Sequence, residues 1–162
     1  MESSAHLPAH RLRIALVHPQ IAPNTGNVAR LCVATGTELH LVRPLGFVLG
    51  DRELKRSAMD YWPRLRLTVH DDIDAFTQAM VGVRLWLFTS KATRNYWDAD
   101  YTDGDCLVFG SETAGLPASF VERHADRAVR IPQRPGERCL NLSTAVGIGL
   151  YEALRWSMHK RH

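Results

Sequence analysis

The chain has 162 residues, of which 45% are hydrophobic and 23% are charged, as in one ordinary globular domain with a buried core. Its formal net charge of +3 is mild, so it permits a nucleic-acid partner without indicating one. Cys32, Cys106 and Cys139 are widely spaced and form no CxxC or Cys/His cluster, which argues against a disulfide framework and a zinc site. The sequence has no secretory leader and no apolar run of about 20 residues, so we expect a cytoplasmic protein without a membrane partner.

Short apolar runs, with helical patterns between most of them, recur along the chain after an aperiodic start. We expect a loose leader over residues 1–11 and a single domain over residues 12–158. Runs rich in branched residues are typical of strands that are buried on both faces. The alternation predicts an α/β fold with an open, mostly parallel sheet, which binds ligands beyond the carboxyl ends of its strands. The expected strands are Leu12–Val17, Leu39–Val42, Leu65–Val69, Leu85–Phe88, Leu107–Phe109 and Ala128–Ile131.

A first polar segment, residues 18–30, follows the first expected strand and leads into a helix that Gly36 ends. Helical spacing places Asn24, Asn27 and Arg30 on one polar stripe. Free N–H groups at a helix start attract an anion, and a guanidinium one turn further along the helix can bind a phosphate. The segment therefore indicates an RNA-backbone or catalytic site, unless Asn24 is simply the N-cap and Arg30 a solvated surface charge.

A second segment, residues 109–117, again joins the end of an expected strand to a helix. Gly110 and Gly115 permit a tight loop whose backbone is exposed to a ligand. The segment lacks the Gly-Lys-Ser/Thr ending of a triphosphate-binding loop, and no strand is followed by GxGxxG, so kinase and dinucleotide-binding interpretations lose support. An ordinary turn with a helix cap is the alternative.

A third segment, residues 131–143, lies before the last expected helix, and Asn141 or Ser143 is a natural N-cap for that helix. Within the helix, Gly147 and Gly149 permit unusually close packing on a neighbour. The loop is rich in arginine, which makes it a candidate for phosphate contact, although solvated basic loops are common. The arginines are Arg127, Arg130, Arg134 and Arg138.

Together and in this order, the three segments resemble the motifs of the SPOUT methyltransferases. They are most similar to the small TrmL-like branch, which methylates the ribose 2′-hydroxyl of the cytidine or uridine at the tRNA wobble position. The resemblance covers residues 14–156 and is carried by 23–27 with 30–32, by 110–117, and by 131–132 with 141–143. The Asp60-Tyr-Trp62 stretch, after an expected basic helix, resembles a segment of the same branch.

The resemblance implies a parallel sheet with helices on both faces and a C-terminal trefoil knot that forms the cofactor pocket. The implied cofactor is S-adenosylmethionine, which leaves as S-adenosylhomocysteine, and no metal is needed. Cys139 stands where many relatives have serine, which would remove a hydroxyl role but not a backbone contact. The residues that the resemblance places at the cofactor are Phe88, Thr89, Gly110, Ile131 and Cys139.

The resemblance also implies a homodimer that acts on the tRNA anticodon stem-loop, with an active site completed across the dimer interface. Arg30 would be the catalytic arginine, supported by Asn24 and Glu112, and Asn141 would shape the site beside the methyl donor. Because the pKa of arginine exceeds about 12, we expect Arg30 to act as an electrostatic organiser and not as a base. The expected RNA contacts are Arg134, Arg138 and Tyr151.

Three alternatives remain open on the sequence. The first is a knotted 2′-O-methyltransferase that acts on ribosomal RNA or on another tRNA position. The second is a knotted RNA-binding protein without catalysis. The third is a flavodoxin-like nucleotide module, which the alternation of strands and helices permits but which accounts for none of the three motifs.

Overall fold

A six-stranded sheet forms the centre of the computed structural model, which describes residues 6–50, 52, 56 and 60–159. The strand order is β3-β2-β1-β5-β4-β6, and the pairings between these strands are all parallel. The predicted mostly parallel sheet is therefore confirmed. The strands are β1 (Arg13–Val17), β2 (Glu38–Val42), β3 (Leu67–His70), β4 (Leu85–Phe88), β5 (Cys106–Phe109) and β6 (Ala128–Val129).

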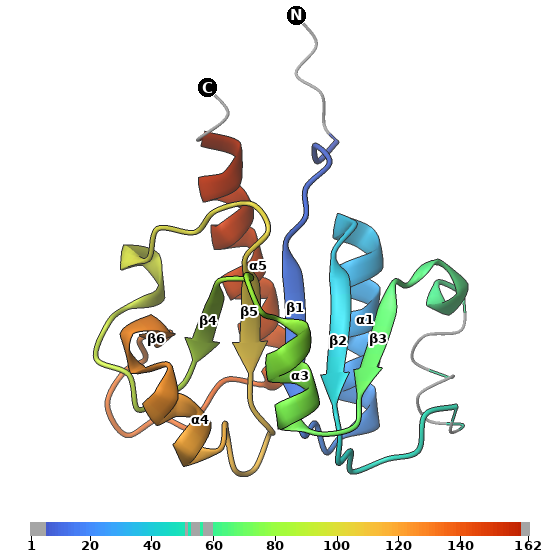
Figure 1. Ribbon diagram of the computed structural model, residues 1–162, viewed down its shortest axis with the longest axis horizontal. Coiled ribbons are helices and arrows are strands. Elements are labelled where there is room, and N and C mark those ends of the chain that lie inside the picture. Colours follow the sequence, from blue (N-terminus) through green and yellow to red (C-terminus); the bar gives the residue numbers. More distant parts are fainter. Residues whose placement is uncertain (1–5, 51, 53–55, 57–59, 160–162) are drawn as a thin grey trace, which may run out of the picture.

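Helices cover both faces of the sheet, as expected. Helices α1 and α5 lie behind it in Figure 1, and α3 and α4 lie in front. None of the helices in the described part of the chain is both long and apolar enough to span a membrane. The α-helices are α1 (Ala22–Thr35), α3 (Ile73–Ala79), α4 (Ala118–Arg123) and α5 (Leu142–His159), and the 3-10 turns are η1 (Trp62–Arg64), η2 (Tyr96–Asp98) and η3 (Ala125–Arg127).

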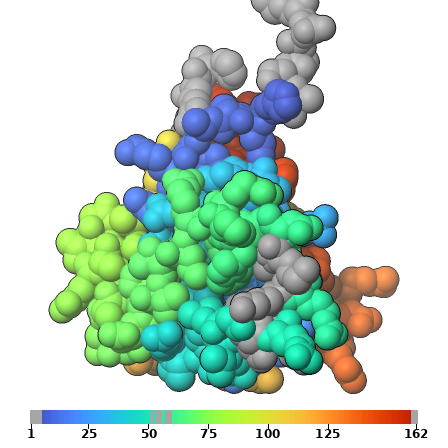
Figure 2. Space-filling model, turned by 90° about the vertical axis from the view of Figure 1, so that its right-hand side faces the viewer, coloured from blue at the N-terminus to red at the C-terminus, as the bar shows by residue number. Residues whose placement is uncertain are grey.

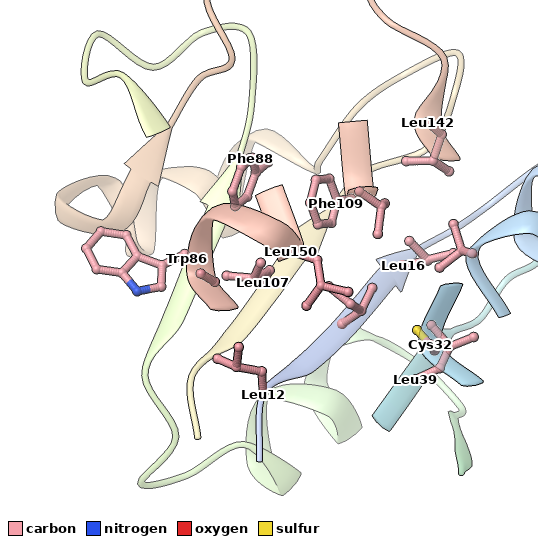
Figure 3. Close-up of a cluster of buried hydrophobic side chains, with 14 of the residues drawn as sticks. Leu12, Leu16, Cys32, Leu39, Trp86, Phe88, Leu107, Phe109, Leu142 and Leu150 are labelled. Atoms are coloured by element: carbon pink, nitrogen blue, oxygen red, sulfur yellow. The ribbon is translucent and has the colours of Figure 1, made fainter. Parts of the chain in front are cut away.

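The two faces of the sheet each carry a hydrophobic core. On the α1 and α5 face, Leu16, Leu107 and Leu150 are buried in one cluster (Figure 3). On the opposite face, Phe76 of α3 and Phe120 of α4 are fully buried in a second cluster. Burial on both faces explains why these strands have continuous apolar runs and not an alternating pattern.

Two strand boundaries differ from the predictions by two residues, each for an identifiable reason, and the boundaries of β1, β2 and β5 and the end of β3 differ by one residue at most. The third strand begins at Leu67 and not Leu65, because the residues before it form η1 and Leu65 serves as the C-cap of that turn. The sixth strand ends at Val129, because Arg130 leaves β4 and pairs with Asn95 in an isolated bridge. The basic helix expected before Asp60 lies largely outside the described residues.

The starts and ends of the two long helices correct other expectations. Gly36 ends α1 with a φ of 69°, as predicted, but the N-cap is Ile21 and Asn24 lies inside the first turn. At α5, Asn141 is the cap, since its Oδ1 accepts from the Ser143 backbone N–H at 3.0 Å. The domain boundaries and the knotted path of the C-terminal segment stay predictions.

The described part of the expected leader contacts the domain. Leu7 packs against the core on the α1 and α5 face. His10 Nε2 lies 2.7 Å from the Thr35 carbonyl oxygen at the end of α1, and the Arg11 N–H donates to Asp103 at 2.6 Å. Residues 1–5 lie outside the described part of the chain.

Candidate active site

A pocket of about 480 Å³ opens at the carboxyl edge of the sheet, where the loops after β4, β5 and β6 meet the starts of α1 and α5. This is the edge at which parallel α/β sheets bind ligands. The three polar segments found in the sequence all reach it. The predicted cofactor residues line the pocket, and they are Phe88, Thr89, Gly110, Ile131 and Cys139.

The loop after β5 is held in a tight turn. Ser111 and Gly115 exchange two backbone hydrogen bonds, at 3.2 and 3.0 Å, and Gly115 has a φ of 69°. A Cβ on Gly110 would lie 2.1 Å from the Gly115 carbonyl carbon and 2.2 Å from the Leu116 nitrogen, so only glycine fits there. The turn therefore brings bare backbone to the pocket wall, as the sequence predicted.

Glu112, in that turn, is bonded to the start of α1. Its Oε1 accepts from the Gln20 N–H at 2.9 Å, and its Oε2 accepts from the Ile21 N–H at 2.7 Å. The carboxylate thereby supplies the cap that α1 lacks locally, and a negative charge is favourable at a helix N-terminus. The second motif is thus fixed directly to the first.

Asn24 connects this carboxylate to the third motif. Its Nδ2 donates to Glu112 Oε2 at 3.3 Å, and its Oδ1 accepts from Asn141 Nδ2 at 3.1 Å. Asn24 is buried, with 8% of its surface exposed, so both ends of its amide are held inside the protein. Asn141 in turn accepts from the Ser143 hydroxyl at 2.6 Å. Glu112, Asn24 and Asn141 form a continuous network along one wall of the pocket.

Two aromatic rings form an apolar part of the pocket. Phe88 and Phe109, at the ends of β4 and β5, stack with centroids 4.5 Å apart, and the rings lie side by side in Figure 3. Gly149 of α5 lies directly against them, because a Cβ there would be 2.9 Å from Phe88 and 3.2 Å from Phe109. The predicted close approach is confirmed for Gly149 but is wrong for Gly147 within one chain, since a Cβ there would lie 4.0 Å from its nearest neighbour, Leu31.

Arg30 does not reach this pocket in the same chain. The polar stripe that the spacing predicted is divided in the structure, because Asn27 and Arg30 are exposed on α1 whereas Asn24 is buried. Arg30 lies instead near Tyr61. Burial raises the pKa of Tyr61, and the positive charge of Arg30 opposes that rise.

The expected RNA contacts also lie outside the pocket lining. Arg134 and Arg138 are exposed on the loop after β6, which is orange and projects from the body in Figure 2. Gln133 bridges this loop by donating from Nε2 to the Arg138 carbonyl at 2.6 Å. Tyr151 is 52% exposed on α5.

Comparison with known proteins identifies the family to which this chain belongs. The sequence profile of the SpoU rRNA Methylase family matches residues 11–151, which include all three motifs. The chain belongs to the SpoU methylase family. A tRNA (cytidine(34)-2′-O)-methyltransferase of Burkholderia ambifaria is 46% identical over 145 residues, a match that covers 88% of this chain and 93% of the relative.

Solved structures agree with the SpoU assignment. A protein whose structure was described as giving insights into the 2-OH methylation of C/U34 on tRNA is 42% identical, with a TM-score of 0.86, over 91% of this chain and 96% of that chain. An AdoMet-bound rRNA methyltransferase from Sinorhizobium meliloti is 27% identical, with a TM-score of 0.82, over 93% of this chain and 58% of that one.

Some residues of the SpoU pocket were missed at the sequence level. Ser90 and Lys91 follow β4, and Gln133 and Leu140 flank the loop before α5. Ligands generally lie beyond the carboxyl ends of parallel strands. Because Ser90 and Lys91 follow the carboxyl end of β4, this rule could have predicted them from the sequence. In the described part of the chain, no three His, Cys, Asp or Glu side chains gather in a way that could hold a metal ion.

Proposed function

We propose that this SpoU chain transfers a methyl group from S-adenosylmethionine to the ribose 2′-hydroxyl of the wobble pyrimidine, nucleoside 34, of tRNA. The observation that carries the proposal is the network of Glu112, Asn24 and Asn141, which joins the three motifs at one pocket. The substrate assignment is supported by the relatives of 46% and 42% identity, which are described as acting on, or in connection with, nucleoside 34 of tRNA.

The pocket suits the proposed cofactor. Its volume of about 480 Å³ falls in the range of small-molecule sites, roughly 300–1,000 Å³. Phe88 and Phe109 offer an apolar surface to a purine ring, and the turn at Gly110 and the backbone near Ile131 offer hydrogen-bonding groups. When bound, the cofactor would supply an electrophilic methyl group. Cys139 lines the same pocket and can contribute its backbone there.

The protein's contribution to such a reaction is alignment and charge. Methyl transfer is an in-line displacement, so placing the 2′-oxygen at the methyl group supplies much of the rate enhancement. Glu112 and Asn24 fix the start of α1 against the loop, and Asn141 fixes the start of α5. A guanidinium such as Arg30 would hold the RNA phosphate and favour the developing negative charge on the 2′-oxygen, while the proton passes to phosphate or water.

Arg30 does not line the pocket of its own chain. For Arg30 to act at a bound cofactor, it must therefore reach the pocket of another chain. We therefore infer a homodimer in which Arg30 of one subunit acts at the pocket of its partner. The exposed face of α5 that carries Tyr151 would lie at or near that interface and contact the tRNA anticodon stem-loop, together with Arg134 and Arg138. A cytoplasmic location follows from the proposed tRNA substrate.

Replacing Arg30 tests the catalytic assignment. Arg30→Ala should lower kcat for tRNA methylation at least about 100-fold, because the transition-state charge loses its partner. Calorimetry should show unchanged binding of S-adenosylmethionine. The control is Arg123→Ala, an exposed arginine on α4. If Arg30→Ala keeps its turnover, the proposed role of Arg30 is refuted. If the wild type does not bind S-adenosylmethionine, the proposed enzymatic activity is refuted in favour of an RNA-binding protein without catalysis.

Mixed dimers test whether the site is shared. Arg30→Ala and Asn141→Ala chains should each be inactive alone. Mixed after unfolding and refolding together, they should regain activity, because one pocket of each mixed dimer would then carry both native residues. No recovery, with mixed dimers demonstrated by differently tagged chains, contradicts a site completed by the partner.

A further inference from the structure

Three guanidinium groups converge on one buried indole on β4, the strand next to the β6 edge of the sheet. The Arg84, Arg94 and Arg127 Cζ atoms lie 5.0, 5.2 and 5.2 Å from the centre of the Trp86 ring. Trp86 is 1% exposed and lies at the margin of the core cluster in Figure 3. Cation–π contacts are individually favourable, but three cations around one ring repel one another unless anions balance them.

Among the residues that the structure describes, a buried carboxylate neutralises only one of the three arginines. Arg84 donates to both oxygens of Asp105, which is 4% exposed, with a closest distance of 2.8 Å. Arg127 lies 3.8 Å from Asp126, a largely exposed carboxylate, so that pair is weak. Arg94 forms no ion pair with any described residue, and it donates only to the neutral Asp98 carbonyl, at 2.9 Å.

A hollow of about 230 Å³ adjoins this cluster, which contributes Arg94 to its lining. Arg94 and Lys91 contribute cations to its lining, and Asp126 contributes the one carboxylate among its lining residues. Lys91 also lines the main pocket, so the two cavities adjoin. The Lys91 side chain is exposed and forms no ion pair with the described residues.

We propose that this hollow binds a backbone phosphate of the substrate RNA, next to the nucleoside whose ribose enters the main pocket. Arg94 is the principal ligand, held in place by its cation–π contact with Trp86, and Lys91, which also lines the hollow, adds positive charge. A planar guanidinium binds phosphate in a bidentate manner, and the indole beneath it reduces the entropy lost on binding. The inference rests on the proposed RNA methyltransferase function and adds a substrate contact to it.

The test is the salt dependence of RNA binding by Arg94→Gln. An anticodon stem-loop RNA with a wobble cytidine is the probe, and binding is measured by fluorescence anisotropy from low to moderate salt. Loss of one phosphate contact should reduce the slope of log K against log salt by about one. We expect KM for the RNA to rise about three- to tenfold, with kcat and S-adenosylmethionine affinity close to wild type.

Two further variants separate binding from structure. Arg94→Lys keeps the charge and should restore the salt slope while recovering only part of the affinity. Arg66→Gln is the control, because Arg66 is exposed beside β3 at the opposite edge of the sheet. A wild-type slope and KM in Arg94→Gln overturn the phosphate site. RNA binding is measured without turnover. An inactive wild type would therefore refute the proposed function, whereas the salt dependence of binding by Arg94→Gln would still test the phosphate site.

Discussion

At the scale of single residues, one carboxylate connects two distant parts of the chain. Glu112 accepts hydrogen bonds from the Gln20 and Ile21 N–H groups and from the Asn24 amide. The sequence predicted Asn24 as the local N-cap because Asn is common there. The actual cap comes from a residue about 90 positions away, and no local pattern can show a cap supplied by tertiary contact.

Replacement of that carboxylate is the prediction at this scale. In Glu112→Gln the side chain keeps one accepting oxygen, so it cannot accept from all three donors, and its new NH₂ group would face a backbone N–H group. We expect a loss of about 1–3 kcal/mol in the free energy of unfolding. We also expect kcat for methylation to fall about 10- to 100-fold, because the start of α1 would shift. Urea unfolding and single-turnover kinetics measure the two effects.

Glu137→Gln is the matched control for that prediction, since Glu137 is exposed on the loop before α5. Its unfolding free energy and kcat should stay close to those of the wild type. Equal effects of the two substitutions would show that Glu112 does not hold the site together.

At the scale of elements, the sequence was most informative where burial decides the structure. Strand β4 was predicted with its observed bounds, because an apolar run buried on both faces has a clear pattern. The pocket lining by Gly110 and Ile131 followed from the family resemblance. Periodicity did not predict the cluster around Trp86, since arginine stacking on an indole leaves no regular spacing in the sequence.

The glycines of α5 give a paired prediction. Gly149→Ala should lower the free energy of unfolding by about 1–3 kcal/mol, because the new methyl group would overlap Phe88 and Phe109. Gly147→Ala should leave stability unchanged or raise it by about 0.5–1 kcal/mol, because its Cβ would lie at an ordinary van der Waals distance from Leu31 and alanine favours the helix. Equal losses in the two variants, measured by urea unfolding, would contradict the close contact at Gly149.

At the scale of the whole molecule, a buried histidine pair couples stability to pH. His40 of β2 and His70 of β3 lie with ring nitrogens 2.9 Å apart, and both side chains are buried. Burial lowers the pKa of His40 to about 4, and burial also lowers the pKa of His70. The folded state therefore keeps these rings neutral at a pH where the unfolded chain takes up protons.

The sign of the effect follows from this difference in pKa. The stabilisation is complete above the ordinary histidine pKa of 6.5 and is lost as the pH falls towards 4. For His40 alone the expected loss is on the order of 3 kcal/mol. His40→Gln should have a shallower pH dependence of unfolding free energy between pH 6.5 and 4.5, whereas His159→Gln, at an exposed position, should follow the wild type. Identical slopes in His40→Gln and the wild type would rule out this coupling.

The central claim concerns which atom receives the methyl group, and mass-spectrometric mapping of RNA addresses it directly. The wild-type chain is incubated with S-adenosylmethionine and total RNA from cells that lack the activity, and each new methyl group is assigned to a nucleoside and an atom. We predict a single new ribose 2′-O-methyl group on a wobble cytidine or uridine of tRNA. Methylation confined to ribosomal RNA, to another tRNA nucleoside or to a base atom would contradict the account.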